Sequence, residues 1–351
     1  MALLGTKPTI SSELNDFYLQ LKAKNVLPLW DVLADLVTPA PQPACQPSLW
    51  RYEELRPLLM WSGAVTTLEE AERRVLVLEN PGLPGMSQVT HSLYAGLQLI
   101  LPGEVAHSHR HIASALRFVI EGEGAYTAVD GERTKMLPGD FIITPSWRFH
   151  DHANEGTSPV VWMDGLDLPI VNLFDTSFAE QHQQTSQPLS REEGDALSRY
   201  GTNLLPLDYK AESLTTPVFN YPYSQSRKAL EQLRRSGPVN PYHGIKMQYI
   251  NPVTGGYPMP TIAAFLQLLP SGFHGLCSRS TDSTVYCVVE GQGCSRIGDS
   301  SFVWQPHDVF VVPSWHSVSH DAENEAVLFS FSDRAAQKSL GLWREELFSP
   351  R

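Results

Sequence analysis

The feature that most constrains this chain is a pattern of short strands that occurs twice. From residue 92 onward, short apolar runs alternate with turns rich in Gly, Pro, Asn and Asp. The stretch 103–124 matches 272–293 in register, and 138–147 matches 306–315 at an offset of 168 residues. Strands of this length and spacing predict an all-β sandwich or barrel, and the repeat predicts two copies of it.

The segments outside the two β blocks predict helices and connections. We expect helices over 11–24, 68–74 and 225–236, and a short C-terminal helix near 335–347. The pattern divides the chain into five parts. Two are β domains, at 91–172 and 241–333, and a connection with a helix (173–240) joins them. A helical N-terminal arm with the first strands (1–90) precedes them, and a C-terminal helix (334–351) follows.

The composition excludes several classes of protein. The 351 residues include 26 Lys and Arg against 38 Asp and Glu, which gives a formal net charge of −12. Such a surface repels nucleic-acid phosphates and anionic membranes, so we expect neither as a partner. No apolar run is long enough to span a bilayer, and the first residues show no signal peptide. The 4 scattered cysteines form no disulfide scaffold or zinc cluster and favour a cytoplasmic location.

Histidines gather on two predicted strands of the first β block. His109 and His111 stand two residues apart, so on a strand they point to the same side, about 7 Å apart. His150, on a later strand, can complete a set of three neutral imidazoles that leaves metal positions open for substrate and O2. A single histidine usually has a surface or core role, but three at this spacing favour a metal site.

These residues resemble the motifs of the cupin superfamily. The first cupin motif reads Gly-x5-His-x-His, then three or four residues, then Glu-x6-Gly. Gly103, His109, His111 and Gly122 follow this motif, and Ala115 stands where cupins usually carry a glutamate ligand. The resemblance therefore implies a ligand set without a carboxylate.

The second cupin motif reads Gly-x5-Pro-x-Gly-x2-His-x3-Asn. Gly139, Pro145, His150 and Asn154 follow it, with Trp147 in the place of the second glycine. The resemblance implies that the metal ligands are the three histidines named above. His107 lies too early for the first motif and is left outside the set.

The second copy has lost the corresponding ligands. Ser278 and Ser280 replace the first two histidines, and Val318 matches His150. Because a serine hydroxyl is a poor replacement for imidazole toward Fe(II), we expect one metal per chain. We then expect the second copy to have a structural role, in which it completes the fold and buries an interface. The alternative is that it contains a cryptic binding site.

Longer stretches narrow the resemblance to the gentisate 1,2-dioxygenases and their relatives that act on salicylate and 1-hydroxy-2-naphthoate. These stretches are HSHRHIASALRFVIEGEG (107–124), GDFIITPSWRFHDHAN (139–154) and WMDGLDLPIV (162–171). The family implies a bicupin fold, all-β dominated, with two double-stranded β-helix (jelly-roll) barrels, a helical N-terminal region and a few peripheral helices. It also implies Fe(II), a homotetramer, and cleavage of gentisate (2,5-dihydroxybenzoate) by O2 between C1 and C2 to maleylpyruvate in aromatic hydrocarbon catabolism.

Five further residues are candidates within this interpretation. Arg117 shares the parity of His109 and His111 if their strand continues, and a lone arginine in an apolar strand requires a substrate carboxylate or a buried acid as partner. His152 is a candidate proton acceptor tuned by Asp164, and its alternative is a surface role. Gln98 and Arg73 are candidates to bind substrate. The alternative for Gln98 is an amide that is hydrogen-bonded within the core, and the alternative for Arg73 is an exposed position at a helix end.

Three rival functions remain open at the level of sequence. The nearest is the same chemistry on salicylate or 1-hydroxy-2-naphthoate, because ring specificity depends on pocket volume. A zinc or manganese cupin isomerase or hydrolase is more distant. A non-catalytic bicupin is the third, and the complete set of histidines in the first copy argues against it.

Overall fold

The computed structural model describes residues 12–202 and 204–349, in two compact units, Met1–Gln42 and Pro43–Arg351. The first unit contains α1 (Ser12–Ala23) and α2 (Leu29–Leu36). Phe17 and Trp30 stack with ring centroids 6.5 Å apart, so the two helices pack on each other. The helix predicted over 11–24 is confirmed, except for Ser11, which lies outside the described residues.

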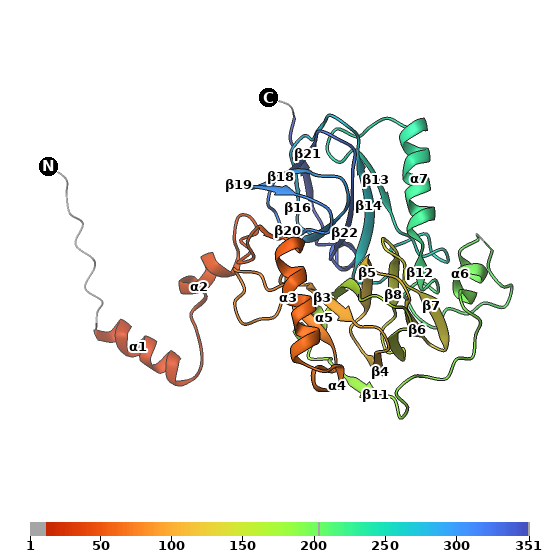
Figure 1. Ribbon diagram of the computed structural model, residues 1–351. Coiled ribbons are helices and arrows are strands. Elements are labelled where there is room, and N and C mark those ends of the chain that lie inside the picture. The colour runs from red at the N-terminus through yellow and green to blue at the C-terminus, as the bar shows by residue number, and fades with distance from the viewer. Residues whose placement is uncertain (1–11, 203, 350–351) are drawn as a thin grey trace. The chain divides into compact units, whose positions relative to one another are not determined.

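The second unit contains two barrels, each made of two sheets (Figure 1). The strands of the first barrel are β2 (Arg74–Val77), β3 (Tyr94–Ile100), β4 (Val105–His111), β5 (Ala115–Glu121), β6 (Ala125–Val129), β7 (Glu132–Lys135), β8 (Phe141–Thr144), β9 (His150–Asn154), β10 (Val160–Leu166), β11 (Ala179–Gln181) and β12 (Asn220–Tyr221). One sheet has the order β12-β8-β5-β10-β3-β2, and the other has the order β11-β4-β9-β6-β7.

The second barrel repeats this arrangement, which confirms the predicted bicupin fold. Its strands are β1 (Ser48–Trp50), β13 (Ile245–Gln248), β14 (Ala263–Leu269), β15 (Phe273–His274), β16 (Ser278–Ser280), β17 (Thr284–Glu290), β18 (Gly293–Ile297), β19 (Ser300–Trp304), β20 (Val309–Val312), β21 (Val318–Ala322), β22 (Ala326–Ser332) and β23 (Glu345–Leu347). One sheet has the order β1-β20-β17-β22-β14-β13, and the other follows β19-β18-β21-β16-β23, with β15 paired to β21.

The two barrels share one hydrophobic core between the sheet that contains β3 and β5 and the sheet that contains β22. Leu97 and Leu99 of β3 are buried in it, and Phe118 of β5 stacks on Phe329 of β22 with ring centroids 4.2 Å apart. Because side chains alternate across a strand, the intervening residues point the other way, into the first barrel. This alternation sends Gln98 and Arg117 toward the predicted site.

The helices lie around the barrels. They are α3 (Tyr52–Val65), α4 (Leu68–Ala71), α5 (Leu168–Leu173), α6 (Asp195–Tyr200), α7 (Tyr223–Ser236) and α8 (Arg334–Ser339). The helix predicted over 225–236 is confirmed by α7, and the one predicted over 68–74 is confirmed only as far as Ala71, because Arg74 already begins strand β2. The predicted C-terminal helix is wrong beyond Ser339, because Gly341 has a positive φ of 73° and the chain then forms β23, which pairs with β16. Among the described residues, no helix combines the length and apolar character that a membrane crossing requires.

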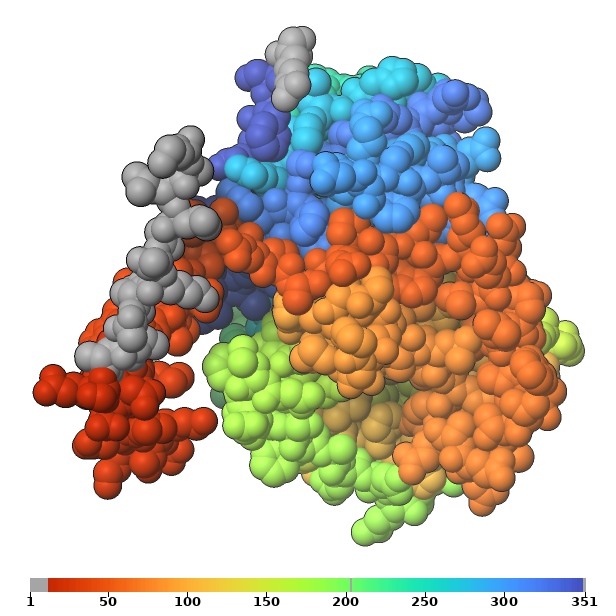
Figure 2. Space-filling view, turned by 90° about the vertical axis from the view of Figure 1, so that its left-hand side faces the viewer, coloured from red at the N-terminus to blue at the C-terminus, as the bar shows by residue number. Residues whose placement is uncertain are grey.

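The segment before the first barrel binds to both barrels, which the sequence pattern did not predict. Its strand β1 pairs with β20, and the Tyr52 amide donates to Asp308 of the second barrel at 2.8 Å. Arg56 of the adjoining helix donates to Glu121 of the first barrel at 2.9 Å. Figure 2 shows this segment in orange between the blue C-terminal barrel and the paler orange strands of the first.

Candidate active site

The three predicted metal ligands converge inside the first barrel. Strands β4 and β9 pair so that His109 lies opposite His150, and His111 follows on the same face of β4. One ring nitrogen from each histidine lies within 4.8 Å of those of the other two. The three ring centroids are separated by 4.2, 4.9 and 5.3 Å.

Backbone carbonyls fix the orientation of all three rings. The Nδ1 atoms of His109, His111 and His150 lie 3.3, 2.7 and 3.0 Å from the carbonyl oxygens of His107, Ala113 and Arg148, respectively. An Nδ1 proton that donates to a carbonyl leaves Nε2 as the metal-binding atom, and this arrangement is common around metal-bound histidines. The Nε2 atom of His150 is buried without a hydrogen-bond partner among the described residues. The donor set therefore fits a divalent metal held by three imidazoles.

The site keeps these imidazoles neutral. Burial, together with the nearby charges of Arg73 and Arg117, lowers the pKa of His109 to about 3 and that of His111 to about 4. Burial also places the pKa of His150 well below its ordinary value. At neutral pH the rings do not have to lose a proton before they bind a metal ion.

A strained turn supports one of the ligands. Trp147, which replaces the second motif glycine, has a φ of 59°, and its amide donates to the His111 carbonyl at 2.8 Å. Arg110 lies over the indole ring, 4.4 Å from its centroid. Trp315 repeats this geometry in the second barrel, with a φ of 61° and Arg279 at 4.5 Å. Because both barrels have this contact, it supports the fold of the turn rather than the chemistry.

Arg117 lies in the barrel interior as predicted, and it has a protein partner. Its side chain is only 4% exposed, and its Nε lies 3.5 Å from Asp164, the residue directly opposite on β10. Arg117 also donates to the Thr144 hydroxyl at 2.5 Å. Burial raises the pKa of Asp164 to about 6, while Arg117 opposes this rise. The buried acid therefore balances the charge of Arg117 inside the cavity.

The expected contact between His152 and Asp164 is wrong. Asp164 accepts a hydrogen bond from the Trp162 indole at 2.9 Å, and its ion pair is with Arg117. His152 is buried, and its Nδ1 instead lies 2.9 Å from the Thr127 hydroxyl, whereas its Nε2 has no partner among the described residues. Thr127 was not identified from the sequence, because the register that places β6 beside β9 is a long-range feature.

Gln98 and Arg73 are both largely buried, and Arg73 contacts one of the histidines. Gln98 is 3% exposed and lies opposite Trp162, and its amide nitrogen is buried without a described partner. Arg73 donates to the His107 carbonyl at 2.7 Å, and the same Nη2 lies 2.5 Å from His109 Nδ1. Two N–H donors do not face each other at that distance. When Nε2 of His109 binds a metal, Nδ1 carries the proton. The Arg73 guanidinium must then move away from the His109 ring.

A cavity of about 580 Å³ leads from the surface to this cluster. Its walls come from α4, β4 and the connection after α5, and they include Arg73, His107, His109, Glu180 and Thr185. In Figure 2 it corresponds to the hollow between the orange and light-green segments. The sequence did not predict that the connection adds β11 beside β4, because this three-residue strand is exposed and polar.

Comparisons with known proteins agree with this geometry. The cupin domain family matches residues 96–166. Gentisate 1,2 dioxygenase 1 of Aquipseudomonas alcaligenes is 56% identical over 339 residues, covering 97% of this chain and 98% of its own. A 5-aminosalicylate 1,2-dioxygenase of Comamonas sp is 35% identical, with 99% and 93% covered. A structure of salicylate 1,2-dioxygenase from Pseudoaminobacter salicylatoxidans, described as adducts with gentisate, gives a TM-score of 0.92 at 32% identity, with 99% and 97% covered.

The chain belongs to the gentisate 1,2-dioxygenase family. Membership over almost the whole chain makes the protein a ring-cleaving dioxygenase for a small aromatic acid. The two rivals from other classes, a zinc or manganese isomerase or hydrolase and a non-catalytic bicupin, have no counterpart in the relatives named above.

The second barrel of this dioxygenase shows what the ligand strands become without a metal site. Ser278 lies opposite Val318 in the same register in which His109 lies opposite His150. The predicted equivalence of these positions is thus confirmed. His320, which corresponds to His152, is also buried and bonds a hydroxyl at its Nδ1, that of Ser295 at 2.8 Å.

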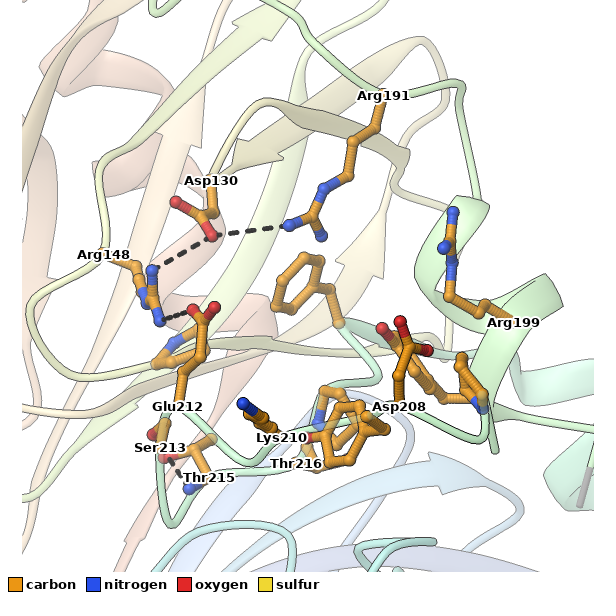
Figure 3. A pocket seen from close by; sticks show the side chains of 16 residues that line it. Asp130, Arg148, Arg191, Arg199, Asp208, Lys210, Glu212, Ser213, Thr215 and Thr216 are labelled. Carbon is orange, nitrogen blue, oxygen red and sulfur yellow. Dashed lines mark hydrogen bonds and ion pairs between the residues drawn. The ribbon is translucent and has the colours of Figure 1, made fainter. Parts of the chain in front are cut away.

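A further cavity of about 360 Å³ lies on the first barrel of the dioxygenase (Figure 3). Four of its charged side chains pair with one another. Arg148 binds Asp130 at 3.3 Å and Glu212 at 2.7 Å, and Arg191 also approaches Asp130, at 3.8 Å. Because these charges are paired, we assign the reaction to the cavity at the histidines.

Proposed function

We propose that the protein cleaves gentisate with O2 between C1 and C2 to give maleylpyruvate, using one Fe(II) per chain. The observation that carries this proposal is the cluster of three neutral imidazoles in a chain 56% identical to a gentisate 1,2-dioxygenase. Both oxygen atoms enter the product, so no other oxidant or reductant is required. Salicylate and 1-hydroxy-2-naphthoate are the alternative substrates.

The bound iron would supply a redox-active centre for O2 and two positions for the carboxylate and 2-hydroxyl of the substrate. Around it, the protein provides the charges that hold an anionic ring. Arg73 and Arg117 are the proposed partners of the substrate carboxylate, since both act on the pKa of the clustered histidines. Gln98, with its unpartnered amide nitrogen, is the proposed donor to the substrate or O2.

His152 is the proposed acceptor of the proton from the 5-hydroxyl. The Thr127 hydroxyl donates to the Met136 sulfur at 3.3 Å, so its oxygen accepts the Nδ1 proton of His152. This arrangement leaves Nε2 without a proton and without a partner. A neutral imidazole in this tautomer can accept a proton at Nε2.

Turnover of single substrates tests the assignment. We expect the iron-loaded enzyme to consume gentisate and O2 in equal amounts, with the appearance of maleylpyruvate absorbance. Salicylate lacks the 5-hydroxyl and should react with a kcat/KM lower by about 100-fold or more. Turnover of salicylate without turnover of gentisate would replace the proposed substrate.

Replacing His152 with asparagine tests its proposed role. We expect kcat on gentisate to fall about 100-fold, while KM and iron content stay close to those of the wild type. His320→Asn is the matched control in the second barrel and should leave kcat unchanged. A parallel loss of iron in His152→Asn would show that the ring only supports the metal site.

We also propose that the enzyme is a cytoplasmic homotetramer. The 4 cysteines, all within the described residues, form no disulfide, which suits a reducing compartment. Large apolar side chains are exposed in each unit, among them Trp30 of α2 and Trp61 of α3, both more than 60% exposed. Exposed apolar surface of this kind is typical of contacts between subunits.

A further inference from the structure

The second barrel contains a cavity of about 330 Å³ in the place where the first barrel holds its histidines. Ser278, Ser280 and Val318 line it, so the positions of the lost ligands open into it. Replacing imidazoles with these small side chains leaves the space. Its other walls include Lys246, Phe265, Gln267, Asp282, Tyr286, Arg334 and Trp343.

Polar groups in this cavity have no hydrogen-bond partner within the described chain. Gln267 of β14 is 0% exposed, and both atoms of its amide group are unpartnered. A buried amide without partners costs about 1–3 kcal/mol, so such a group is usually satisfied by a ligand or by water.

The lining of the cavity carries two cations, Lys246 and Arg334, and two anions, Asp282 and Glu345. Asp282 is committed to Arg334, at 3.1 Å, and also accepts from the Trp343 indole at 2.8 Å. Lys246 forms no ion pair with any described residue, and its Nζ lies 4.9 Å from the Phe265 ring centroid and 5.5 Å from that of Tyr286. Burial and the charge of Arg334 lower the pKa of Lys246 to about 7, while Asp282 and Glu345 oppose this fall.

We propose that this cavity binds a small aromatic carboxylate, whose carboxylate pairs with Lys246 and accepts a hydrogen bond from the Gln267 amide. The aromatic side chains of Phe265, Tyr286 and Trp343 provide apolar walls, and the volume exceeds that of a single-ring acid. Ser278, Ser280 and Val318 stand where the first barrel has its metal-binding imidazoles. The carboxylate is therefore bound by protein side chains and not by a metal ion. This site is separate from the catalytic cavity and does not rest on the choice of gentisate as substrate.

Equilibrium dialysis with radiolabelled benzoate tests the proposal on the full-length, iron-loaded enzyme without O2. We expect Lys246→Met to lose one bound benzoate per chain, or to bind it more weakly by about tenfold or more. Lys228→Met, on the exposed side of α7, should bind as the wild type does. Unchanged gentisate turnover in Lys246→Met shows that the catalytic barrel is intact.

Gln267→Leu is the second variant, and it should weaken the same binding event even if Lys246→Met fails to fold. Equal benzoate binding in wild type, Lys246→Met and Gln267→Leu would overturn the proposal. A competition arm with inorganic phosphate defines the class of ligand. Displacement of benzoate by phosphate at about equal concentration would make this an oxyanion site and overturn the aromatic assignment, whereas retention of benzoate supports it.

Discussion

Replacing His150 with alanine is expected to abolish iron binding and gentisate turnover together. His150 is the most buried of the three ligands. Its Nε2 atom has no hydrogen-bond partner among the described residues, so it is available to the metal. Loss of a residue that only orients a ligand already weakens metal binding by about 10–100-fold, so loss of a ligand should exceed 100-fold. Iron per chain after anaerobic reconstitution, together with O2 uptake, measures both effects.

Val318→Ala is the matched control, because Val318 lies at the same place in the second barrel and pairs with Ser278 as His150 pairs with His109. It should keep the iron and the turnover of the wild type. Reconstitution with Zn(II) should fill the wild-type site without activity. Full iron content in His150→Ala, or activity with zinc alone, would contradict the proposed site.

The metal cluster could be predicted from the sequence because its geometry is mostly local. His109 and His111 share a face through the two-residue period of a strand, and the motif spacing brings His150 onto the neighbouring strand. The parity argument also pointed to Arg117, but it assumed one continuous strand, whereas β4 ends at His111 and Arg117 reaches the barrel interior on β5. The placement of the three histidines needs only the strand period and one pairing of adjacent strands.

The partners of these residues could not be predicted, because they depend on strand register over long distances in the chain. Asp164 lies opposite Arg117 and not beside His152, since β10 pairs with β5. Thr127 reaches His152 only through the pairing of β6 with β9. Both contacts are decided by the order of strands in the folded sheets, which the residue pattern does not specify.

The pairing of the short strands could not be predicted from the sequence pattern either. The exposed strands β11 and β23 have three residues each, too few for an alternation to be recognised. Strand β1 joins the second barrel although it precedes the first. The cavity around Lys246 was missed because its polar lining comes from several strands that each look ordinary, and the loss of the histidines indicated only that no metal would bind.

Replacing Asp164 with leucine is expected to reduce the free energy of unfolding by about 3–5 kcal/mol, because it leaves the buried Arg117 guanidinium without its counter-ion. Denaturant titration at neutral pH measures the loss. The sign of the pH dependence also follows. Because the folded pKa of Asp164, about 6, exceeds that of an unfolded aspartate, this carboxyl stabilises the wild type as the pH falls from about 6 toward 4. The Asp164→Leu variant lacks this gain in stability. The difference in free energy of unfolding between wild type and variant should therefore increase as the pH falls over that range.

The double variant Arg117→Met, Asp164→Leu separates stability from function. Removing both charges leaves no unpaired charge in the barrel, although the buried Trp162 indole N–H loses its acceptor, so the free energy of unfolding should return to within about 1–3 kcal/mol of the wild type. Substrate binding should be impaired even so, because the cation proposed to hold the substrate carboxylate is absent. We expect iron binding with a KM for gentisate raised about tenfold or more. A stable double variant with wild-type KM would show that Arg117 serves only to balance Asp164, and that the substrate carboxylate is held elsewhere, with Arg73 as the remaining candidate.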